Sequence, residues 1–141
     1  MNIVLDSNIL FSALLKDSTT RKIILTYDGF FLFPSFIFVE MEKHKDELLT
    51  KSGMNRKDFD ELLHMILKKV LVVPASVMKP YREEALSIVR DIDINDALFI
   101  ACALVHSDSI LWSDDKKLKN QSRVRILNTK EIIEYLKVDL S

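Results

Sequence analysis

Acidic side chains beside apolar runs are the residues of this sequence best suited to chemistry. Asp6 follows the run NIVL, and Asp114 and Asp115 follow ILWS. Asp93 and Asp96 stand three residues apart just before the run ALFIACALV, so they lie on roughly one face of a first helical turn. Carboxylates gathered closely repel one another, and hard divalent cations relieve that repulsion. Because no histidine or cysteine stands beside them, these oxygen donors favour Mg²⁺ or Mn²⁺ over zinc.

Glu40 is a further candidate for the same site. It stands four residues after Phe36 in the segment PSFIFVEMEKHK, so the two side chains share one face of a helix. The apolar residues FIFV indicate that this face packs inward, which would direct Glu40 toward the end of the sheet. The alternative is that Glu40 pairs with Lys43 or His44 on a solvated face.

Each of the other acidic residues also has a purely structural interpretation. Asp6 could form a turn or an N-cap at the end of its strand, and Asp93 could cap the helix that follows it. Asp96 could be a favourable charge in the first turn of that helix. Asp114 or Asp115 could cap a short helix directly after them. No single acidic residue is therefore decisive, and the prediction of a site depends on their joint placement.

The elements that would bring these residues together are short strands alternating with longer helices, the pattern of a parallel α/β sheet. We expect strands at 2–5, 30–33, 71–73, 110–112 and 124–127. We expect helices at 8–15, 20–27, 36–51, 57–69, 80–89, 94–105 and 129–137, and a short one at 116–119. The predicted fold class is α/β, a three-layer α/β/α sandwich around a parallel, roughly five-stranded sheet. In such a sheet, ligands bind beyond the carboxyl ends of the strands, where the acidic residues fall.

Helix boundaries are indicated by a few residues with known end preferences. Ser35 can cap the helix that starts after it, and Pro80 suits the first position of a helix. Asn128 and Glu131 have the spacing of a capping box at the start of the last helix. The apolar helix at 94–105 is expected to pack on the sheet with little exposure.

Composition limits the classes of protein that the sequence can specify. The chain has 141 residues, of which 48% are hydrophobic, so we expect one domain over residues 1–141 with a sizeable core. A net charge of −1 lacks the overall positive field typical of proteins that bind duplex DNA. Two glycines cannot form a phosphate-binding loop or a dinucleotide fingerprint. Three scattered histidines and one cysteine do not form a zinc site, and no GxSxG motif is present.

The same features bear on where the protein would act. One cysteine excludes a disulfide framework and suits a reducing compartment, so we expect a cytoplasmic location. The first residues, MNIVLDSN, have no basic segment typical of a secretion signal. The longest apolar runs are well short of the roughly 20 residues that span a bilayer, so no membrane association is expected.

A basic segment directly follows the last acidic pair. The segment KKLKNQSRVR, residues 116–125, contains five basic residues and no acidic one. Such a segment beside the site could follow an RNA backbone, although an ordinary solvated loop is the alternative. The candidate RNA-binding residues are Lys116, Lys117, Lys119, Arg123 and Arg125. Trp112 is expected in the core or at the lip of the site rather than as a stacking platform for bases.

Aromatic residues are concentrated early in the chain. The phenylalanines expected to pack in the core are Phe30, Phe31, Phe33, Phe36 and Phe38. Some of them could instead line a contact between subunits.

Four short motifs, in order, resemble the PIN-domain family of metal-dependent ribonucleases, which includes the VapC-type toxins of toxin–antitoxin pairs. These motifs are IVLDSNIL (3–10), PSFIFVEMEKHK (34–45), DINDALFIACAL (93–104) and ILWSDDKKL (110–118). The resemblance covers essentially the whole chain, although no motif is specific by itself. It implies the same five-stranded parallel α/β/α sandwich that the hydrophobic pattern predicts.

The resemblance also assigns roles to individual residues. It implies that four acidic residues hold the metal ion and its water as the catalytic group, namely Asp6, Glu40, Asp96 and Asp115. Asp93 would assist as a further ligand. Asn8 and Ser113 would orient carboxylates by hydrogen bonds. Asp114 occupies the variable position of the last motif, where it could replace Asp115 as ligand or simply add negative charge.

The predicted function is a Mg²⁺- or Mn²⁺-dependent endoribonuclease. A carboxylate-held ion lowers the pKa of a bound water and holds the attacking and leaving oxygens of a phosphodiester in line. The alternative is a catalytically silent scaffold that binds RNA or protein, which would have no need of a full set of acidic ligands. A receiver-like phosphoacceptor domain also clusters acids at strand ends, but Lys130 falls past the last cap rather than at the end of the last strand. The resemblance to the PIN family further implies a homodimer and, for a toxin, a small antitoxin protein inserted into the acidic groove.

Overall fold

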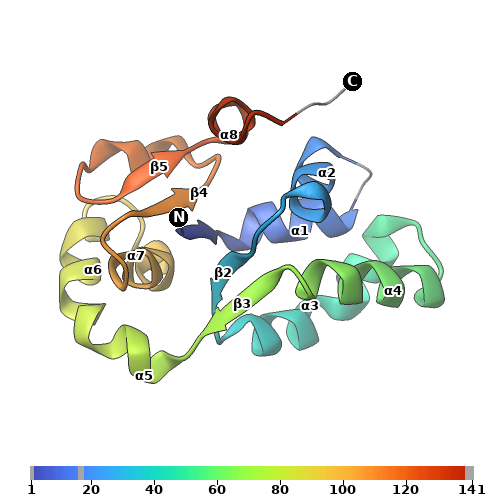
Figure 1. Cartoon of the computed structure of the whole chain (residues 1–141). Helices are drawn as coiled ribbons and strands as arrows, with labels where there is room; N and C mark the ends of the chain where they lie inside the picture. The colour runs from blue at the N-terminus through green and yellow to red at the C-terminus, as the bar shows by residue number, and fades with distance from the viewer. Residues whose placement is uncertain (1, 16–17, 139–141) are drawn as a thin grey trace.

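Five short apolar runs form a parallel sheet in the order β3-β2-β1-β4-β5 (Figure 1). This computed structural model describes residues 2–15 and 18–138. The strands are β1 (Asn2–Leu5), β2 (Phe31–Pro34), β3 (Val70–Val73), β4 (Ser109–Trp112) and β5 (Arg125–Leu127). Each of the five expected strands is confirmed to within one residue at either end.

The strand order reverses at β1, which determines where the residues that follow the strands meet. The chain proceeds from β1 to β2 and β3 on one side, then returns to place β4 and β5 on the other. Leu5 pairs with Trp112, and Trp112 pairs with Leu127, so three neighbouring strands end at the same level. The residues that follow them therefore meet at one edge of the sheet, where the order reverses and ligands bind in folds of this kind.

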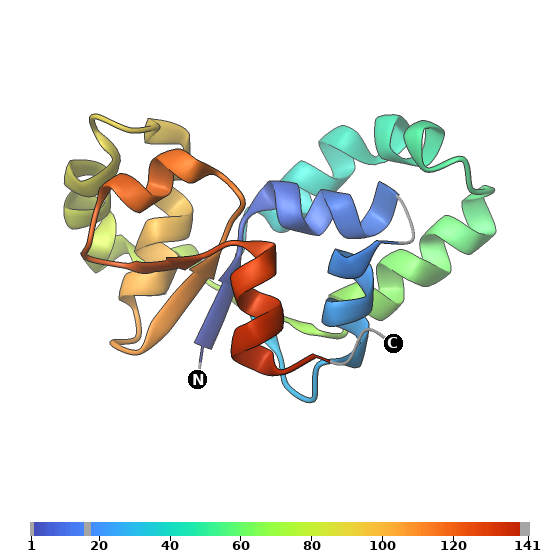
Figure 2. The same cartoon turned by 90° about the horizontal axis from the view of Figure 1, so that it is seen from above.

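Helices cover both faces of the sheet, which confirms the expected α/β sandwich. Figure 2 shows α6 and α7 on one side of the strands and α1, α2 and α8 on the other. The α-helices are α1 (Ser7–Leu15), α2 (Thr19–Thr26), α3 (Ile37–Ser52), α4 (Arg56–Leu67), α5 (Ala75–Met78), α6 (Arg82–Val89), α7 (Ala97–Leu104) and α8 (Thr129–Leu136). Three short 3₁₀ segments complete the described part of the chain: η1 (Lys79–Tyr81), η2 (Ile94–Asp96) and η3 (Lys116–Asn120).

The most apolar helix, α7, lies against the middle of the sheet as expected. It contacts β1, β2 and β4, and all of its residues from Phe99 to Leu104 are buried. The Phe99 ring meets the rings of Phe33 and Phe36 with centroids 5.5 and 5.6 Å away. Cys102 is free, and burial raises the pKa of its thiol to about 12. This packing fixes the start of α7, where two acidic residues lie.

Two predicted helix boundaries are wrong. Ser35 does not cap α3, because the residue at the N-cap is Phe36, which has helical dihedral angles and no capping side chain. Packing of the Phe36 ring against Phe33 and Phe99 accompanies the start of this helix instead. The helix expected at 80–89 begins only at Arg82, as α6, and Pro80 lies inside the preceding 3₁₀ turn η1, where its missing N–H is tolerated. The capping box of Asn128 and Glu131 is confirmed.

The predicted burial of the phenylalanines is correct only in part. Phe31 and Phe33 are buried in β2, but Phe30 and Phe38 are exposed. Phe30 precedes the strand, and Phe38 follows Ile37, which with Met41 forms the inward face of α3. Trp112 is fully buried, as expected for a core residue. None of the helices in the described ranges is long and apolar enough to cross a membrane.

Candidate functional site

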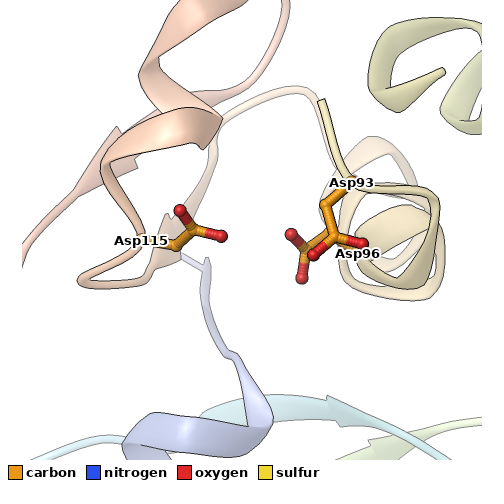
Figure 3. Close-up of side chains that lie close together, drawn as sticks. All are labelled: Asp93, Asp96 and Asp115. Atoms are coloured by element: carbon orange, nitrogen blue, oxygen red, sulfur yellow. The ribbon is translucent and has the colours of Figure 1, made fainter. Parts of the chain in front are cut away.

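Three carboxylates meet at the carboxyl edge of the sheet. Asp115 follows β4, whereas Asp93 precedes the 3₁₀ turn η2 that leads into α7, and Asp96 is the last residue of that turn. One carboxylate oxygen from each lies within 4.8 Å of the others. Figure 3 shows the Asp115 carboxylate directed across the gap toward Asp93 and Asp96. Segments about twenty residues apart in sequence thus bring three acidic groups to one point.

Asp96 is the most perturbed member of this group. Its side chain does not cap α7, and its Oδ2 atom is buried without a hydrogen-bond partner. Burial, followed by the charges of Asp93, Asp115 and Asp6, raises the pKa of Asp96 from 3.8 to about 6. A buried carboxylate oxygen without a donor is costly unless a cation or proton satisfies it. The alternative in which Asp96 is only a favourable charge in the first turn of its helix does not account for this unpartnered oxygen.

Asp6 lies beside the group at the end of β1. Its side chain is 5% exposed and accepts a hydrogen bond from the Ile9 N–H at 2.8 Å, so it does cap α1 as one interpretation proposed. Burial raises the pKa of Asp6, while hydrogen bonds from Ser113 and Ile9 oppose that rise. The charges of Asp114 and Asp115 raise it further. Asp6 thus has a structural role and also belongs to the electrostatic environment of Asp96.

Ser113 connects Asp6 to Asp115. This residue is 1% exposed, and its hydroxyl hydrogen-bonds the Asp6 carboxylate and accepts the Asp115 N–H at 3.1 Å. The Asp115 Oδ1 atom accepts the Lys117 N–H at 3.0 Å and caps η3. The expected short helix and its cap are therefore present. The same hydrogen bonds hold Asp115 in a fixed orientation toward the other carboxylates.

Asp114 is directed away from the group, although it is adjacent to Asp115. Its two carboxylate oxygens accept hydrogen bonds from the N–H and Oγ1–H of Thr129 at 2.7 and 2.8 Å. The Trp112 indole N–H also donates to Thr129 Oγ1, at 3.0 Å. Asp114 thereby ties the end of β4 to the start of α8. Of the two candidates in the last motif, Asp115 is the one placed to act as a ligand.

Comparison with known proteins identifies the fold family. The family model for the PIN domain matches residues 4–137, nearly the whole chain. The chain belongs to the PIN-domain family.

A solved structure is similar to this PIN domain across its length. It is a chain in the crystal structure of VapBC2 from Rickettsia felis bound to a DNA fragment from their promoter. The TM-score is 0.66 at 17% sequence identity, and the alignment covers 91% of this chain and 98% of that chain. At this identity the likeness shows the fold alone. No curated protein sequence matches the chain.

Glu40, which the sequence placed with the acidic residues, is not brought into the group of three in this PIN domain. Its carboxylate lies 3.3 Å from His44 Nε2, one turn along α3. His44 in turn approaches Glu47 at 3.6 Å, and Glu47 pairs with Lys51 at 2.7 Å. The Glu40 carboxylate thus lies beside His44, the partner named in the alternative interpretation, because the i, i+4 spacing places the two side chains on one face of α3.

Asn8 is likewise separate from the carboxylates. It is exposed on α1 and lines a hollow between α1 and α3, together with Phe11, His44 and Leu48. Asn8 makes no hydrogen bond to a carboxylate within the ranges that the structure describes. Its expected orienting role is not seen here, because the α1 turn directs position 8 outward while Ile9 and Leu10 face the core.

The candidate RNA-binding residues fall into two groups. Lys116 and Lys117 are exposed directly beside Asp115, as expected. Lys119 pairs with Glu131, Arg123 pairs with Glu84 at 3.1 Å, and the Arg125 guanidinium lies over the Tyr135 ring at 5.1 Å. Arg123 and Arg125 lie toward the opposite end of the sheet, because Arg125 opens β5 beside Ile110 near the start of β4. The basic segment therefore leads away from the carboxylates instead of surrounding them.

Thr129 is a residue that sequence reasoning missed. It joins Asp114 and Trp112, and all three follow or end neighbouring strands. The contact between Thr129 and Asp114 could have been predicted, because residues that follow adjacent parallel strands lie side by side. That prediction required knowing that β4 and β5 are neighbours.

Proposed function

We propose that this PIN domain is a metal-dependent endoribonuclease that hydrolyses RNA phosphodiesters. The single observation that carries the proposal is the group of Asp93, Asp96 and Asp115, with one Asp96 oxygen buried and unpartnered. Neighbouring negative charge and an unsatisfied oxygen are both relieved by a cation. The PIN family, to which the chain belongs, supplies the nuclease activity that this group would serve.

The donor set fits Mg²⁺ or Mn²⁺. It consists of carboxylate oxygens, which hard divalent cations prefer, and its three residues are only partly buried. We assign Asp93, Asp96 and Asp115 as the residues that hold the ion, with Asp6 contributing charge from beside them. When bound, the ion supplies a water of lowered pKa and positive charge for the phosphodiester oxygens.

The residues of the chain perform the remaining tasks. Ser113 holds Asp6 and the backbone of Asp115 in place, and Asp115 is oriented further by the Lys117 N–H. Asp96 carries its proton up to a pH of about 6 and must release it before it can bind a cation. Lys116 and Lys117 offer positive charge to the RNA backbone beside the acidic group, which would otherwise repel a polyanion.

In this proposal Glu40 does not bind the ion in the described arrangement, in which its carboxylate is paired with His44 on α3. Its pairing with His44 is the observation that favours the alternative function, a PIN-type scaffold that binds RNA or protein without cleaving it. A scaffold would keep its binding when the acidic residues are replaced and would not cleave in any form, whereas a nuclease would lose cleavage.

We also propose protein partners for this domain, in the cytoplasm. The VapBC2 structure, which is similar in fold, is a complex of a protein pair with DNA. Two large apolar side chains of α3, Phe38 and Val39, are 62% and 68% exposed beside Glu40. An exposed apolar patch of this kind is typical of a protein contact. It would suit a small antitoxin protein or the second subunit of a homodimer.

The test is cleavage of a labelled RNA of mixed structure in Mn²⁺, Mg²⁺ or EDTA. The wild type is compared with Asp96→Asn and with a matched control, Glu47→Gln, which removes a carboxylate that is already paired with Lys51. We expect cleavage by wild type and Glu47→Gln in either metal, none in EDTA, and little by Asp96→Asn. Metal-independent cleavage, or equal cleavage by all three proteins, would contradict the proposal. Binding without cleavage by every protein would establish the scaffold instead.

A further inference from the structure

The segment that carries Asp115 is joined to the first turn of α8 at two points. Near its beginning, the Asp114 carboxylate accepts the N–H and the hydroxyl of Thr129 at 2.7 and 2.8 Å. Near its end, the Lys119 ammonium forms an ion pair with Glu131. Both ends of the segment are therefore held by a helix that follows it in the chain only after β5.

Thr129 makes the better defined of these two connections. The Lys119–Glu131 pair joins side chains that are 42% and 39% exposed, and exposed pairs contribute little. Thr129 instead uses its backbone N–H, its hydroxyl hydrogen and its hydroxyl oxygen, since Oγ1 also accepts the Trp112 indole N–H at 3.0 Å. A hydroxyl that donates to one residue and accepts from another is held in one orientation.

Trp112 connects Thr129 to the middle of the sheet. Its side chain is fully buried, and its backbone pairs with Leu5 of β1 and Leu127 of β5. The hydrogen bonds of Thr129 therefore join the exposed Asp114 carboxylate to a residue whose position is fixed by the core.

The placement of Asp115 depends on this connection. Its own hydrogen bonds, from its N–H to the Ser113 hydroxyl and from the Lys117 N–H to its Oδ1 atom, are made with residues two positions away. Such local bonds orient the carboxylate within its own segment. Contacts with other elements place the segment relative to the other two carboxylates, and the contact of Asp114 with Thr129 is the one made by the neighbouring residue.

We propose that Thr129 is a positioning residue for the cation site, because it holds Asp114 and so fixes Asp115 opposite Asp93 and Asp96. Mg²⁺ demands near-ideal octahedral geometry, so a small displacement of one carboxylate weakens its binding. Replacing a residue that orients a metal ligand typically costs about 10–100-fold in affinity. Thr129 acts one residue further from the ion, so we expect a smaller loss. This inference rests on the proposed function, because it takes the acidic group as a site for a divalent cation.

The test is the Mn²⁺ affinity of the full chain, measured by isothermal titration calorimetry in the absence of RNA. Thr129→Val keeps the branched shape and the backbone N–H but removes the hydroxyl, whereas Thr129→Ser retains the hydroxyl. We expect Thr129→Val to weaken Mn²⁺ binding about three- to tenfold, and Thr129→Ser to stay within about twofold of wild type.

The matched control is the loss of a helix cap elsewhere in the chain. Asn55→Ala removes the side chain that caps α4 by accepting the Asp58 N–H at 2.8 Å. In Figure 1, α4 lies on the other side of the molecule from β4 and β5. Asn55→Ala should lower the Tm without metal, as Thr129→Val does, but leave the Mn²⁺ affinity unchanged.

Two variants of Asp114 separate this connection from the effect of charge. Asp114→Ala removes both the charge and the acceptor, so it should weaken Mn²⁺ binding at least as much as Thr129→Val. Asp114→Asn removes the same charge but keeps an acceptor for Thr129, so it should lose less affinity than Asp114→Ala. The double variant Asp114→Ala/Thr129→Val should bind no more weakly than Asp114→Ala, because both changes break one connection.

A Thr129→Val protein that binds Mn²⁺ as tightly as wild type would overturn the proposal, even if its Tm is lower, because its role would then be structural alone. Equal losses in Thr129→Val and Thr129→Ser would also overturn it. If Thr129→Val does not fold, the two Asp114 variants decide the question, and equal affinities of these two would overturn the proposal. Failure of the nuclease proposal is distinguishable, because wild type would then not cleave RNA while these differences in Mn²⁺ affinity stand.

Discussion

Two groups of acidic residues in this protein have opposite electrostatic environments. On α3, Glu40 and Glu47 flank His44, and the hydrogen bond and charge of Lys51 hold the pKa of Glu47 below its usual value. At the sheet edge, Asp96 faces Asp93 and Asp115, and burial with these charges raises its pKa to about 6. The first group is satisfied by the chain itself. The second group gathers three carboxylates and includes an Asp96 oxygen that is buried without a hydrogen-bond partner, which is why it is the better candidate for chemistry.

The difference arises from where each group lies in the fold. On the exposed helix α3, each of these carboxylates has a partner one turn away, His44 for Glu40 and Lys51 for Glu47. Beyond the carboxyl ends of the parallel strands, Asp115 is instead brought beside Asp93 and Asp96 from a distant segment, so carboxylates meet other carboxylates there. A comparison of the two groups therefore predicts which carboxylates matter for activity.

The largest expected effect is that of Asp115→Asn, because it removes one of the three carboxylates that meet at the sheet edge. We expect a loss of RNA cleavage on the order of 10²–10³-fold, the usual cost of one preorganised electrostatic group. Asp114→Asn is the matched control, since the adjacent carboxylate serves Thr129 and an amide keeps an acceptor for that residue. Initial rates in Mn²⁺ measure both. Equal losses for the two variants would mean that the assignment of Asp115 as the ligand is wrong.

The next effect is stabilisation by metal. Mn²⁺ at about 100 times its dissociation constant should raise the free energy of unfolding by about 2.7 kcal/mol, which for a chain of this size is about 10 °C in Tm. Thermal unfolding with and without Mn²⁺ measures it. The shift should vanish in Asp96→Asn and persist in Glu47→Gln. A shift that persists in Asp96→Asn would place the ion elsewhere.

A smaller loss of cleavage is expected when Glu40 is replaced, and this variant tests whether Glu40 acts with the α3 group or with the sheet-edge group. Because its carboxylate is paired with His44 on α3, Glu40→Gln should lower cleavage less than tenfold, about 1.4 kcal/mol at most. The measurement is the cleavage rate beside that of Asp115→Asn. If Glu40→Gln is as damaging as Asp115→Asn, the Glu40 side chain leaves His44 and joins the ion during catalysis.

The smallest expected effect is on the pH dependence of stability without metal. The folded pKa of Asp96 lies above its ordinary value of 3.8, so its contribution is fully present below pH 4 and is lost as pH rises through about 6. The rise from 3.8 to about 6 corresponds to about 3 kcal/mol, at about 1.4 kcal/mol per pKa unit, and solvent screening of this partly exposed group reduces the expected loss to about 1 kcal/mol. Denaturant unfolding between pH 4 and pH 7 should show this loss in wild type minus Asp96→Asn. A difference that does not change with pH would contradict the raised pKa.

Much of the fold could be predicted because each strand is a short apolar run bounded by turn residues. The last helix was predicted from Asn128 and Glu131, whose capping box needs only local spacing. Ser35 failed as a cap because aromatic packing around Phe36, which joins distant segments, accompanies the start of α3. Local signals therefore predicted elements well and failed where tertiary packing decided a boundary.

The candidate site was predicted less completely than the fold. Strand-end position correctly brought Asp115 beside Asp93 and Asp96, since parallel strands end at one edge. Glu40 and Asn8 lie on helices, where the direction of a side chain depends on the rotation of the helix and on the nearest partner. The sequence offered His44 as that partner for Glu40, but it could not decide between the two faces. Their roles therefore remain predictions for mutagenesis.

The most direct test of the central claim is to locate Mn²⁺ in crystals of the protein by anomalous scattering. The arrangement predicts one strong peak among the carboxylates of Asp93, Asp96 and Asp115, which should disappear in Asp96→Asn. A peak between Glu40, His44 and Glu47, or none at the sheet edge at saturating Mn²⁺ above pH 7, would contradict the account.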